Sequence, residues 1–104
     1  MFLTYNNNVL DKIRYEWDPE KRQSIIEERG LDIVILAPEL LAAQSTIFRK
    51  DERKDYGEDR WLAFGLVGGT RLCLCFTLRD DFVRLITIYK VNTKDWEKYY
   101  EKDD

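Results

Sequence analysis

Residues 60–89 read RWLAFGLVGGTRLCLCFTLRDDFVRLITIY and predict three consecutive antiparallel strands. Apolar residues dominate three stretches of strand length, 60–67, 70–78 and 82–89. Gly68-Gly69 is a two-residue hairpin signal, and Arg79-Asp80-Asp81 marks a second tight turn. Strands joined by turns this short must run antiparallel, so the second half of the chain predicts a meander.

Ahead of this meander, residues 12–17 alternate charged and apolar side chains and predict a half-buried strand whose core face carries Ile13, Tyr15 and Trp17. A helix should follow at once, because Asp18 is a favoured N-cap residue and proline suits the first helical position. We expect this helix to run to Arg29, where Gly30 supplies a left-handed stop.

Residues 31–43 are far more apolar, and their assignment stays open between two structures. Asp32 can cap a helix in which Leu36, Ala37, Leu40 and Leu41 face the sheet at helical spacing. Pro38 should break or kink that helix, so its start is expected nearer Ala37. The alternative is a short strand over 33–36; we expect a helix with a disturbed first part.

The remaining segments complete the element order. Residues 45–50 predict a strand and 51–59 a charged loop, and Asn92 or Thr93 can cap a last helix that ends near Glu101. The order β-α-α-β-β-β-β-α predicts an α+β, two-layer domain with the helices on one face of the sheet. We expect a loose lead-in over 1–11 and a single domain over 12–104.

Alternation along the strands predicts which side chains share a face. We expect the helices to cover the face with the larger apolar residues, to which Leu62, Phe64 and Leu66 belong. The other face should hold Trp61, Ala63 and Gly65. In the last strand, Arg84, Ile86, Ile88 and Lys90 should oppose Val83, Leu85, Thr87 and Tyr89. A mixed second face of this kind is typical of a ligand groove or a protein interface.

Composition narrows the classes of function. The chain has a net charge of −3, a pI near 5.1 and no histidine, so a nucleic-acid site must be a local basic patch and a basic protein partner fits equally well. No apolar run approaches the roughly 20 residues that span a bilayer, so we expect no membrane partner. Cys73 and Cys75 are expected as buried free thiols, which indicates a reducing compartment, so we expect a cytoplasmic protein. We expect no metal or other cofactor.

Four motifs together carry a resemblance to a known family. They are YEWDPEK at 15–21, RGL at 29–31, YGEDRW at 56–61 followed by Gly65-Leu66, and RLIT at 84–87 followed by Lys90. In this order, over residues 12–102, they resemble the BrnT family of bacterial toxins, which is similar in fold to RelE-like ribonuclease toxins.

The resemblance implies a function and partners. It implies the toxin of a type II toxin–antitoxin system, an endoribonuclease that cleaves RNA without metal and inhibits translation. The expected partners are an RNA substrate and a cognate DNA-binding antitoxin of BrnA type; a homodimer and a toxin–antitoxin heterotetramer both stay open.

RNA cleavage needs a base for the 2′-hydroxyl, cations for the phosphorane and an acid for the leaving oxygen. Without histidine, we expect Glu58 as the base, Arg60 and Arg84 as phosphate clamps, and Lys90 as stabiliser or acid. Tyr89 is expected to stack on a base or donate a proton.

The sequence departs from the family pattern at two points. The first helix ends Glu28-Arg29-Gly30 where the family often has Lys-His-Gly, and Tyr89 stands where its last strand usually has arginine. Tyrosine cannot replace a bidentate phosphate donor. An alternative is therefore a catalytically degenerate interaction domain that binds a protein partner and acts as co-repressor.

Simpler structural roles compete with the catalytic ones. In these simpler roles, Glu58 and Arg60 form a surface ion pair, and Arg84 and Lys90 only flank a core strand. The charges of the 51–59 loop nearly cancel, which is typical of a solvated loop. Trp96, Tyr99 and Tyr100 are expected to pack the last helix on the sheet.

Overall fold

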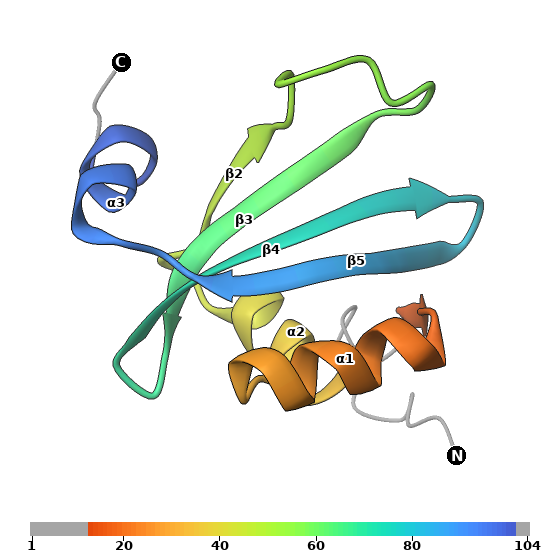
Figure 1. Cartoon of the computed structure of the whole chain (residues 1–104). Helices are drawn as coiled ribbons and strands as arrows, with labels where there is room; N and C mark the ends of the chain where they lie inside the picture. Colours follow the sequence, from red (N-terminus) through yellow and green to blue (C-terminus); the bar gives the residue numbers. More distant parts are fainter. Residues whose placement is uncertain (1–12, 102–104) are drawn as a thin grey trace.

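The computed structural model describes residues 13–101, so the lead-in expected over 1–11 lies outside the described residues. Three helices and one five-stranded sheet make up this part of the chain (Figure 1). In chain order they are β1 (Arg14–Glu16), α1 (Pro19–Arg29), α2 (Ile33–Ala42), β2 (Ile47–Lys50), β3 (Arg60–Val67), β4 (Thr70–Arg79), β5 (Phe82–Lys90) and α3 (Thr93–Tyr99). The α+β class and the element order are those that the sequence predicts.

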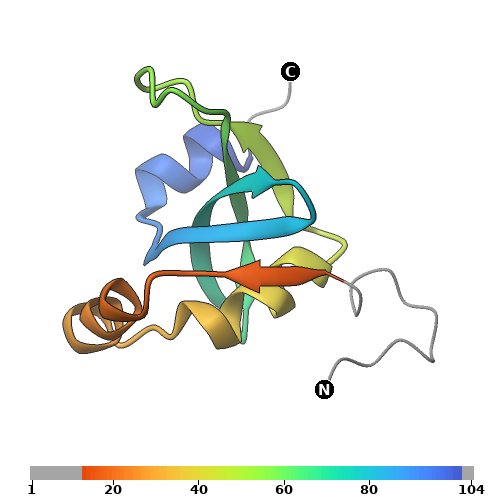
Figure 2. The same ribbon diagram turned by 90° about the vertical axis from the view of Figure 1, so that its right-hand side faces the viewer.

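The strands lie in the order β1-β5-β4-β3-β2. The last four pair antiparallel, which confirms the meander, and β1 joins β5 as a short parallel edge strand. In Figures 1 and 2, α1 and α2 lie below the sheet and α3 lies at its left side. None of the helices in residues 13–101 is long and apolar enough to cross a membrane.

Helix α1 has the ends that the sequence predicts. The Asp18 carboxylate accepts hydrogen bonds from the backbone N–H groups of Glu20 at 2.9 Å and Lys21 at 3.4 Å. Pro19 opens the helix, and Gly30 closes it with a φ of 69°. These local contacts satisfy backbone groups that a helix end leaves without partners.

Helix α2 begins at Ile33, so the alternative strand over 33–36 and a start near Ala37 are both wrong. Asp32 caps it through the Val34 N–H at 3.1 Å and accepts two hydrogen bonds from Arg22 at 2.8 and 2.9 Å. Pro38 lies inside the helix, where it removes one backbone donor. Burial of Ile33, Ala37 and Leu40 on the sheet holds the helix together across this position.

The expected faces of β3 are reversed in the structure. Ala63 and Gly65 lie on the face that packs against α2, and Leu62 and Phe64 point to the opposite face. A Cβ atom on Gly65 would lie 2.6 Å from Thr46 Oγ1 and 2.7 Å from Leu40 Cδ1. Small residues therefore lie where α2 approaches the sheet most closely. The prediction that the larger apolar residues face the helices fails for this reason.

A β-bulge changes the faces of β5. Cys75 pairs with Thr87 and the next residue, Phe76, pairs with Leu85, which leaves Ile86 as an extra residue. Strict alternation is therefore wrong for this strand. Val83, Leu85 and Ile88 all pack in the core between the sheet and the helices α1 and α2, and Arg84 and Tyr89 lie on the opposite face.

Helix α3 packs on this opposite face, which corrects the expectation that all helices share one face. Trp96 is 4 % exposed and lies in a second apolar cluster with residues from β3, β4 and the end of β5. The buried members of this cluster are Leu62, Phe64, Cys73, Cys75, Val91 and Trp96. Burial of Cys73 and Cys75 as free thiols is confirmed.

We predict that Gly65→Ala destabilises the fold by about 1–3 kcal/mol, because the added methyl group must displace Leu40 or Thr46 in a filled core. Urea denaturation followed by tryptophan fluorescence measures the loss. Gly30→Ala is the comparison. No atom lies within 4 Å of the Cβ position of Gly30, so any loss of stability there comes from its left-handed backbone, with φ of 69°, and not from packing. A midpoint unchanged by Gly65→Ala would contradict the close packing.

Candidate functional site

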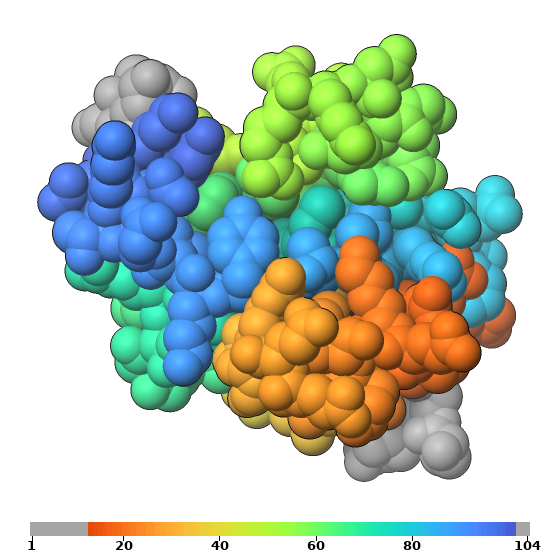
Figure 3. Space-filling view, in the orientation of Figure 1, coloured from red at the N-terminus to blue at the C-terminus, as the bar shows by residue number. Residues whose placement is uncertain are grey.

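A groove crosses the sheet face opposite α2. Its floor is formed by β3, β4 and β5, and α3, the 51–59 loop and α1 rise around it (Figure 3). Two hollows lie along this groove on the same strand β5, one near Arg84 and the other near Tyr89. They differ in charge and in the elements that form them.

The first hollow, which we call the arginine hollow, has a volume of about 180 Å³ and opens to solvent. Its charged lining comes from α1, the 51–59 loop, β3, β4 and β5. The charged residues are Asp18, Lys21, Glu58, Arg60, Arg79 and Arg84. The structure thus brings together three residues selected from the sequence, Glu58, Arg60 and Arg84.

Strand register explains why two of these arginines converge. Thr77 of β4 pairs with Arg60 of β3 on one side and with Arg84 of β5 on the other. Paired residues project from the same face, and neighbouring strands lie about 4.8 Å apart, so the two Cα atoms are separated by roughly 10 Å. The Thr77 hydroxyl donates a 2.6 Å hydrogen bond to the Asp59 carbonyl, which fixes the loop end beside this row.

Glu58 lies between two guanidinium groups. One carboxylate oxygen is 3.4 Å from Arg60 Nε and the other is 3.4 Å from Arg79 Nη2. The Glu58 side chain keeps 29 % of its surface exposed, so a ligand in the hollow can reach it. The geometry is that of a carboxylate oriented by cations and open to a substrate.

A second glutamate, Glu16, contacts two of the hollow's arginines. Glu16 Oε1 is 3.7 Å from Arg79 Nη1 and 3.9 Å from Arg84 Nη1. Arg60 in turn lies over the Tyr56 ring, with its Cζ atom 4.1 Å from the ring centroid. The arginines are thereby positioned by side chains, and Arg84 still has 30 % of its side chain exposed.

The 51–59 loop is organised by Asp51, whose side chain has no exposed surface. Its carboxylate accepts two hydrogen bonds of 2.8 Å from the Arg53 guanidinium and one of 3.1 Å from the Tyr56 hydroxyl. The hydrogen bonds from Arg53 lower the pKa of Asp51 from 3.8 to about 2, against the effect of burial. This part of the loop is therefore a specific structure, not only a solvated charged segment.

The structure separates Tyr89 and Lys90 from the other candidates. Tyr89 lines the second hollow, of about 80 Å³, five residues along β5 from Arg84 and so roughly 16 Å away. Burial, and then a hydrogen bond with Cys73, raise the pKa of Tyr89, which keeps the phenol protonated. Lys90 pairs with Leu72 and is exposed on the opposite face.

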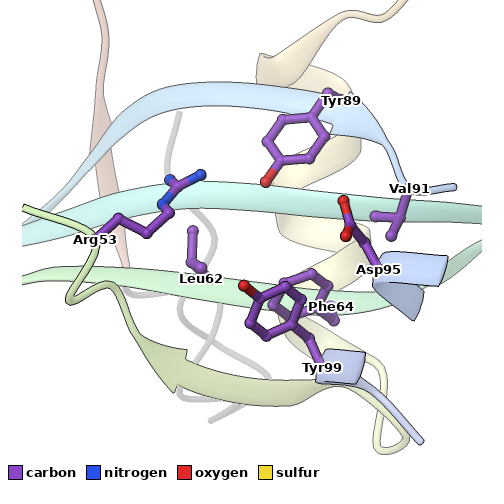
Figure 4. A pocket seen from close by; sticks show the side chains of 7 residues that line it. All are labelled: Arg53, Leu62, Phe64, Tyr89, Val91, Asp95 and Tyr99. Atoms are coloured by element: carbon purple, nitrogen blue, oxygen red, sulfur yellow. The ribbon is translucent and has the colours of Figure 1, made fainter. Parts of the chain in front are cut away.

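The second hollow lies between the 51–59 loop and α3 (Figure 4). Arg53 and Asp95 face it from opposite sides, Tyr89 and Tyr99 form walls, and Leu62 and Phe64 lie at its base. An adjoining hollow of about 270 Å³ shares Arg53, Leu62 and Tyr99 and widens the opening. The sequence pattern does not indicate Arg53 and Asp95, because only the tertiary structure places the loop opposite α3.

Two further residues of the arginine hollow, Lys21 and Arg79, are not among the residues that the sequence indicates as candidates. Lys21 belongs to the WDPEK motif, and its place in that motif is a signal that could have found it. The sequence predicts Arg79 in a turn, whereas it is the last residue of β4 and contacts both glutamates. Among residues 13–101, no three histidine, cysteine, aspartate or glutamate side chains are grouped so that they could hold a metal ion.

The arrangement can bind an anion and move a proton. Arg60, Arg79 and Arg84 can donate charge-assisted hydrogen bonds to a phosphate group. Glu58 is near enough to these cations to accept a proton from a hydroxyl beside such a phosphate. Lys21, exposed on α1, is the remaining cation on the border of the hollow.

We predict that Asp51→Asn destabilises the protein by about 2 kcal/mol at pH 7, since the folded-state pKa of Asp51 lies below its ordinary value. A carboxylate with a lowered pKa stabilises the fold above pH 3.8, and this contribution is lost as the pH falls through about 2. The difference between wild type and Asp51→Asn in urea denaturation should therefore shrink between pH 4 and pH 2.

Glu52→Gln is the matched control, because the neighbouring Glu52 is exposed. It should change stability by less than about 0.5 kcal/mol. An equal loss in both variants, or a difference for Asp51→Asn that does not depend on pH, would contradict the assigned role of Asp51.

Comparison with known proteins gives one match. A family model described as "Ribonuclease toxin, BrnT, of type II toxin-antitoxin system" matches residues 17–95. No curated protein and no solved structure matches the chain. The matched range contains every charged residue of the arginine hollow and ends at Asp95.

Proposed function

Because the chain belongs to the BrnT family of ribonuclease toxins of type II toxin–antitoxin systems, we propose that its arginine hollow is a metal-independent endoribonuclease site. Membership also implies a protein antitoxin as partner. The single observation that supports the proposed site best is Glu58, held 3.4 Å from both Arg60 and Arg79 in an open hollow that Arg84 also lines. We place the reaction in the cytoplasm, with single-stranded RNA as substrate.

The proposed reaction is transfer of the phosphodiester to the neighbouring 2′-oxygen. Glu58 takes the proton of the 2′-hydroxyl, the 2′-oxygen bonds to phosphorus, and the bond from phosphorus to the 5′-oxygen breaks. Lys21 gives a proton to the departing 5′-oxygen. The products are a 2′,3′-cyclic phosphate and a 5′-hydroxyl, and no water or redox partner is consumed.

The arginines supply the charge stabilisation in this proposal. Negative charge grows on the non-bridging oxygens as phosphorus becomes five-coordinate, and preorganised donors lower the barrier most at that point. Arg60 and Arg84, placed on either side of Thr77, can bind those oxygens from two strands. Tyr89 and Lys90 take no part in the bond-breaking step, because one lies in the other hollow and the other on the far face.

The antitoxin is proposed to neutralise the toxin by covering the arginine hollow. An acidic segment suits this surface, since three arginines and Lys21 border it. The chain as a whole carries a charge of −3, so such attraction depends on the local arrangement and not on net charge.

One observation favours the second candidate function, a degenerate interaction domain that acts as co-repressor. Each arginine of the hollow already has a glutamate within 4 Å, either Glu16 or Glu58. These carboxylates reduce the positive potential that RNA would meet. In this case the chain would bind its antitoxin, leave RNA intact and allow normal growth.

We predict that Glu58→Gln lowers the rate of RNA cleavage by about 100- to 10,000-fold, because the amide cannot act as general base. Arg84→Ala should lower it by about 100- to 1,000-fold through loss of a phosphate donor. The rates are measured with purified protein on labelled single-stranded RNA. Growth arrest on induced expression should disappear in both variants.

Arg14→Ala is the matched control for Arg84→Ala, because Arg14 is an exposed arginine on β1 outside the hollow. It should cleave RNA at the wild-type rate. If folded wild-type protein leaves RNA intact and does not arrest growth, the degenerate interaction domain becomes the better account.

We also predict that cleavage proceeds at the same rate with excess EDTA and with added Mg²⁺, since protein cations stabilise the phosphorane in the proposed mechanism. The comparison uses wild type and Glu58→Gln prepared side by side, so that a contaminating nuclease appears in both. Activity that vanishes with EDTA and returns with Mg²⁺ would overturn the metal-independent mechanism.

A further inference from the structure

We propose that the hollow between the 51–59 loop and α3 is a subsite for a guanine base of the RNA, with Asp95 and Arg53 reading its hydrogen-bonding edges. This inference rests on the proposed ribonuclease function and names the substrate feature that the second hollow selects. The site lies along β5 from the arginine hollow. The guanine therefore belongs to a nucleotide near the cleaved bond and does not itself take part in the cleavage.

The charges of this hollow suit a neutral base better than a phosphate. Asp51 binds the Arg53 guanidinium through Nε and Nη2 at 2.8 Å each, which balances its charge. Asp95 adds a carboxylate on the opposite side, which would repel a phosphate group. A ligand here must accept hydrogen bonds at one end and donate them at the other.

The guanidinium is also held in place before any ligand arrives. The Asp51 side chain has no exposed surface, and its two oxygens fix Nε and Nη2 of Arg53. The Nη1 donors are not used by Asp51. A donor that is already oriented loses little conformational entropy on binding, which is the condition for discrimination between bases.

The walls match a flat aromatic ligand. The Tyr99 ring stacks on Phe64 with centroids 5.4 Å apart and planes at 11°. The Tyr89 ring borders the hollow on the side of β5, and Leu62 supplies an apolar base between them (Figure 4). Unstacked RNA bases are commonly bound by aromatic side chains while their edges are hydrogen-bonded.

Guanine fits the donor and acceptor pattern better than the other bases. Its N1–H and N2–H groups are adjacent donors that can meet both oxygens of one carboxylate, and its O6 and N7 atoms are the acceptors that arginine prefers. Cytosine offers one donor group beside its acceptors, and uracil and adenine offer no adjacent donor pair. Asp95 and Arg53 therefore select guanine, with cytosine as the nearest competitor.

The experiment measures binding in a Glu58→Gln background, so that cleavage cannot consume the RNA. Short fluorescent oligouridines carry one central guanosine, inosine, cytidine or adenosine, and fluorescence anisotropy gives each Kd. We expect the guanosine oligomer to bind about 10-fold more tightly than the all-uridine oligomer. Inosine, which lacks the N2 amino group, should lose most of this gain.

Variants then assign the preference to the hollow. Asp95→Asn should abolish the difference between guanosine and inosine, and Glu97→Gln on the exposed side of α3 should keep it as the matched change of charge. Circular dichroism checks that Asp95→Asn stays folded, since Asp95 also receives a 3.4 Å contact from the Asn92 amide. The inosine comparison needs no change at Asp95 and is decisive by itself.

The outcomes separate this inference from the proposed function. Equal binding of all oligomers, tightest binding of cytidine, or no RNA binding overturns the guanine subsite, even if wild type cleaves RNA. Guanosine preference without any cleavage by wild type supports the subsite and overturns the ribonuclease mechanism. A preference that survives in folded Asp95→Asn overturns the assignment to Asp95.

Discussion

Helix α2 approaches β3 so closely that this contact sets which side chains lie on each face of the sheet. At Gly65 there is no room for a side chain, because Leu40 and Thr46 would meet its Cβ atom below 3 Å. The small residues of β3 must therefore face α2, and alternation then turns Leu62 and Phe64 to the other face. Those two large side chains create an apolar surface on that face, and α3 packs on it through Trp96.

The bulge at Ile86 completes the groove on that face. Without an extra residue, Arg84 and Tyr89 would point to opposite faces of the sheet, because they are five positions apart. The bulge lets both face the groove while Leu85 and Ile88 stay in the core. Bulges often redirect a side chain in this way, and here one aligns the two hollows along a single strand.

The two hollows divide the charge of the groove. Arg60, Arg79 and Arg84 share two glutamates, Glu16 and Glu58, near one end, whereas Arg53 at the other end is balanced by the buried Asp51. For this reason the acidic pI is compatible with an enzyme that acts on RNA. Affinity for phosphate depends on the local electrostatic field in a cleft, and the net charge of the chain contributes little at distances beyond about 10 Å in physiological salt. Membership of a ribonuclease toxin family and an acidic chain are thus not in conflict.

The order of the helices and strands and the family can be read from residue patterns alone. Asp18, Pro19 and Gly30 act through backbone contacts within a few residues, and the turn at Gly68-Gly69 is equally local, so these features are readable without the fold. The convergence of Glu58, Arg60 and Arg84 was also readable, because each lies at the same end of its strand or beside it. The faces of β3 and β5, the position of α3, and the placement of the Arg53–Asp51 pair opposite Asp95 could not be read in this way. Those features depend on which surfaces approach each other in space, and a hydrophobic pattern records that a residue is buried but not which element buries it.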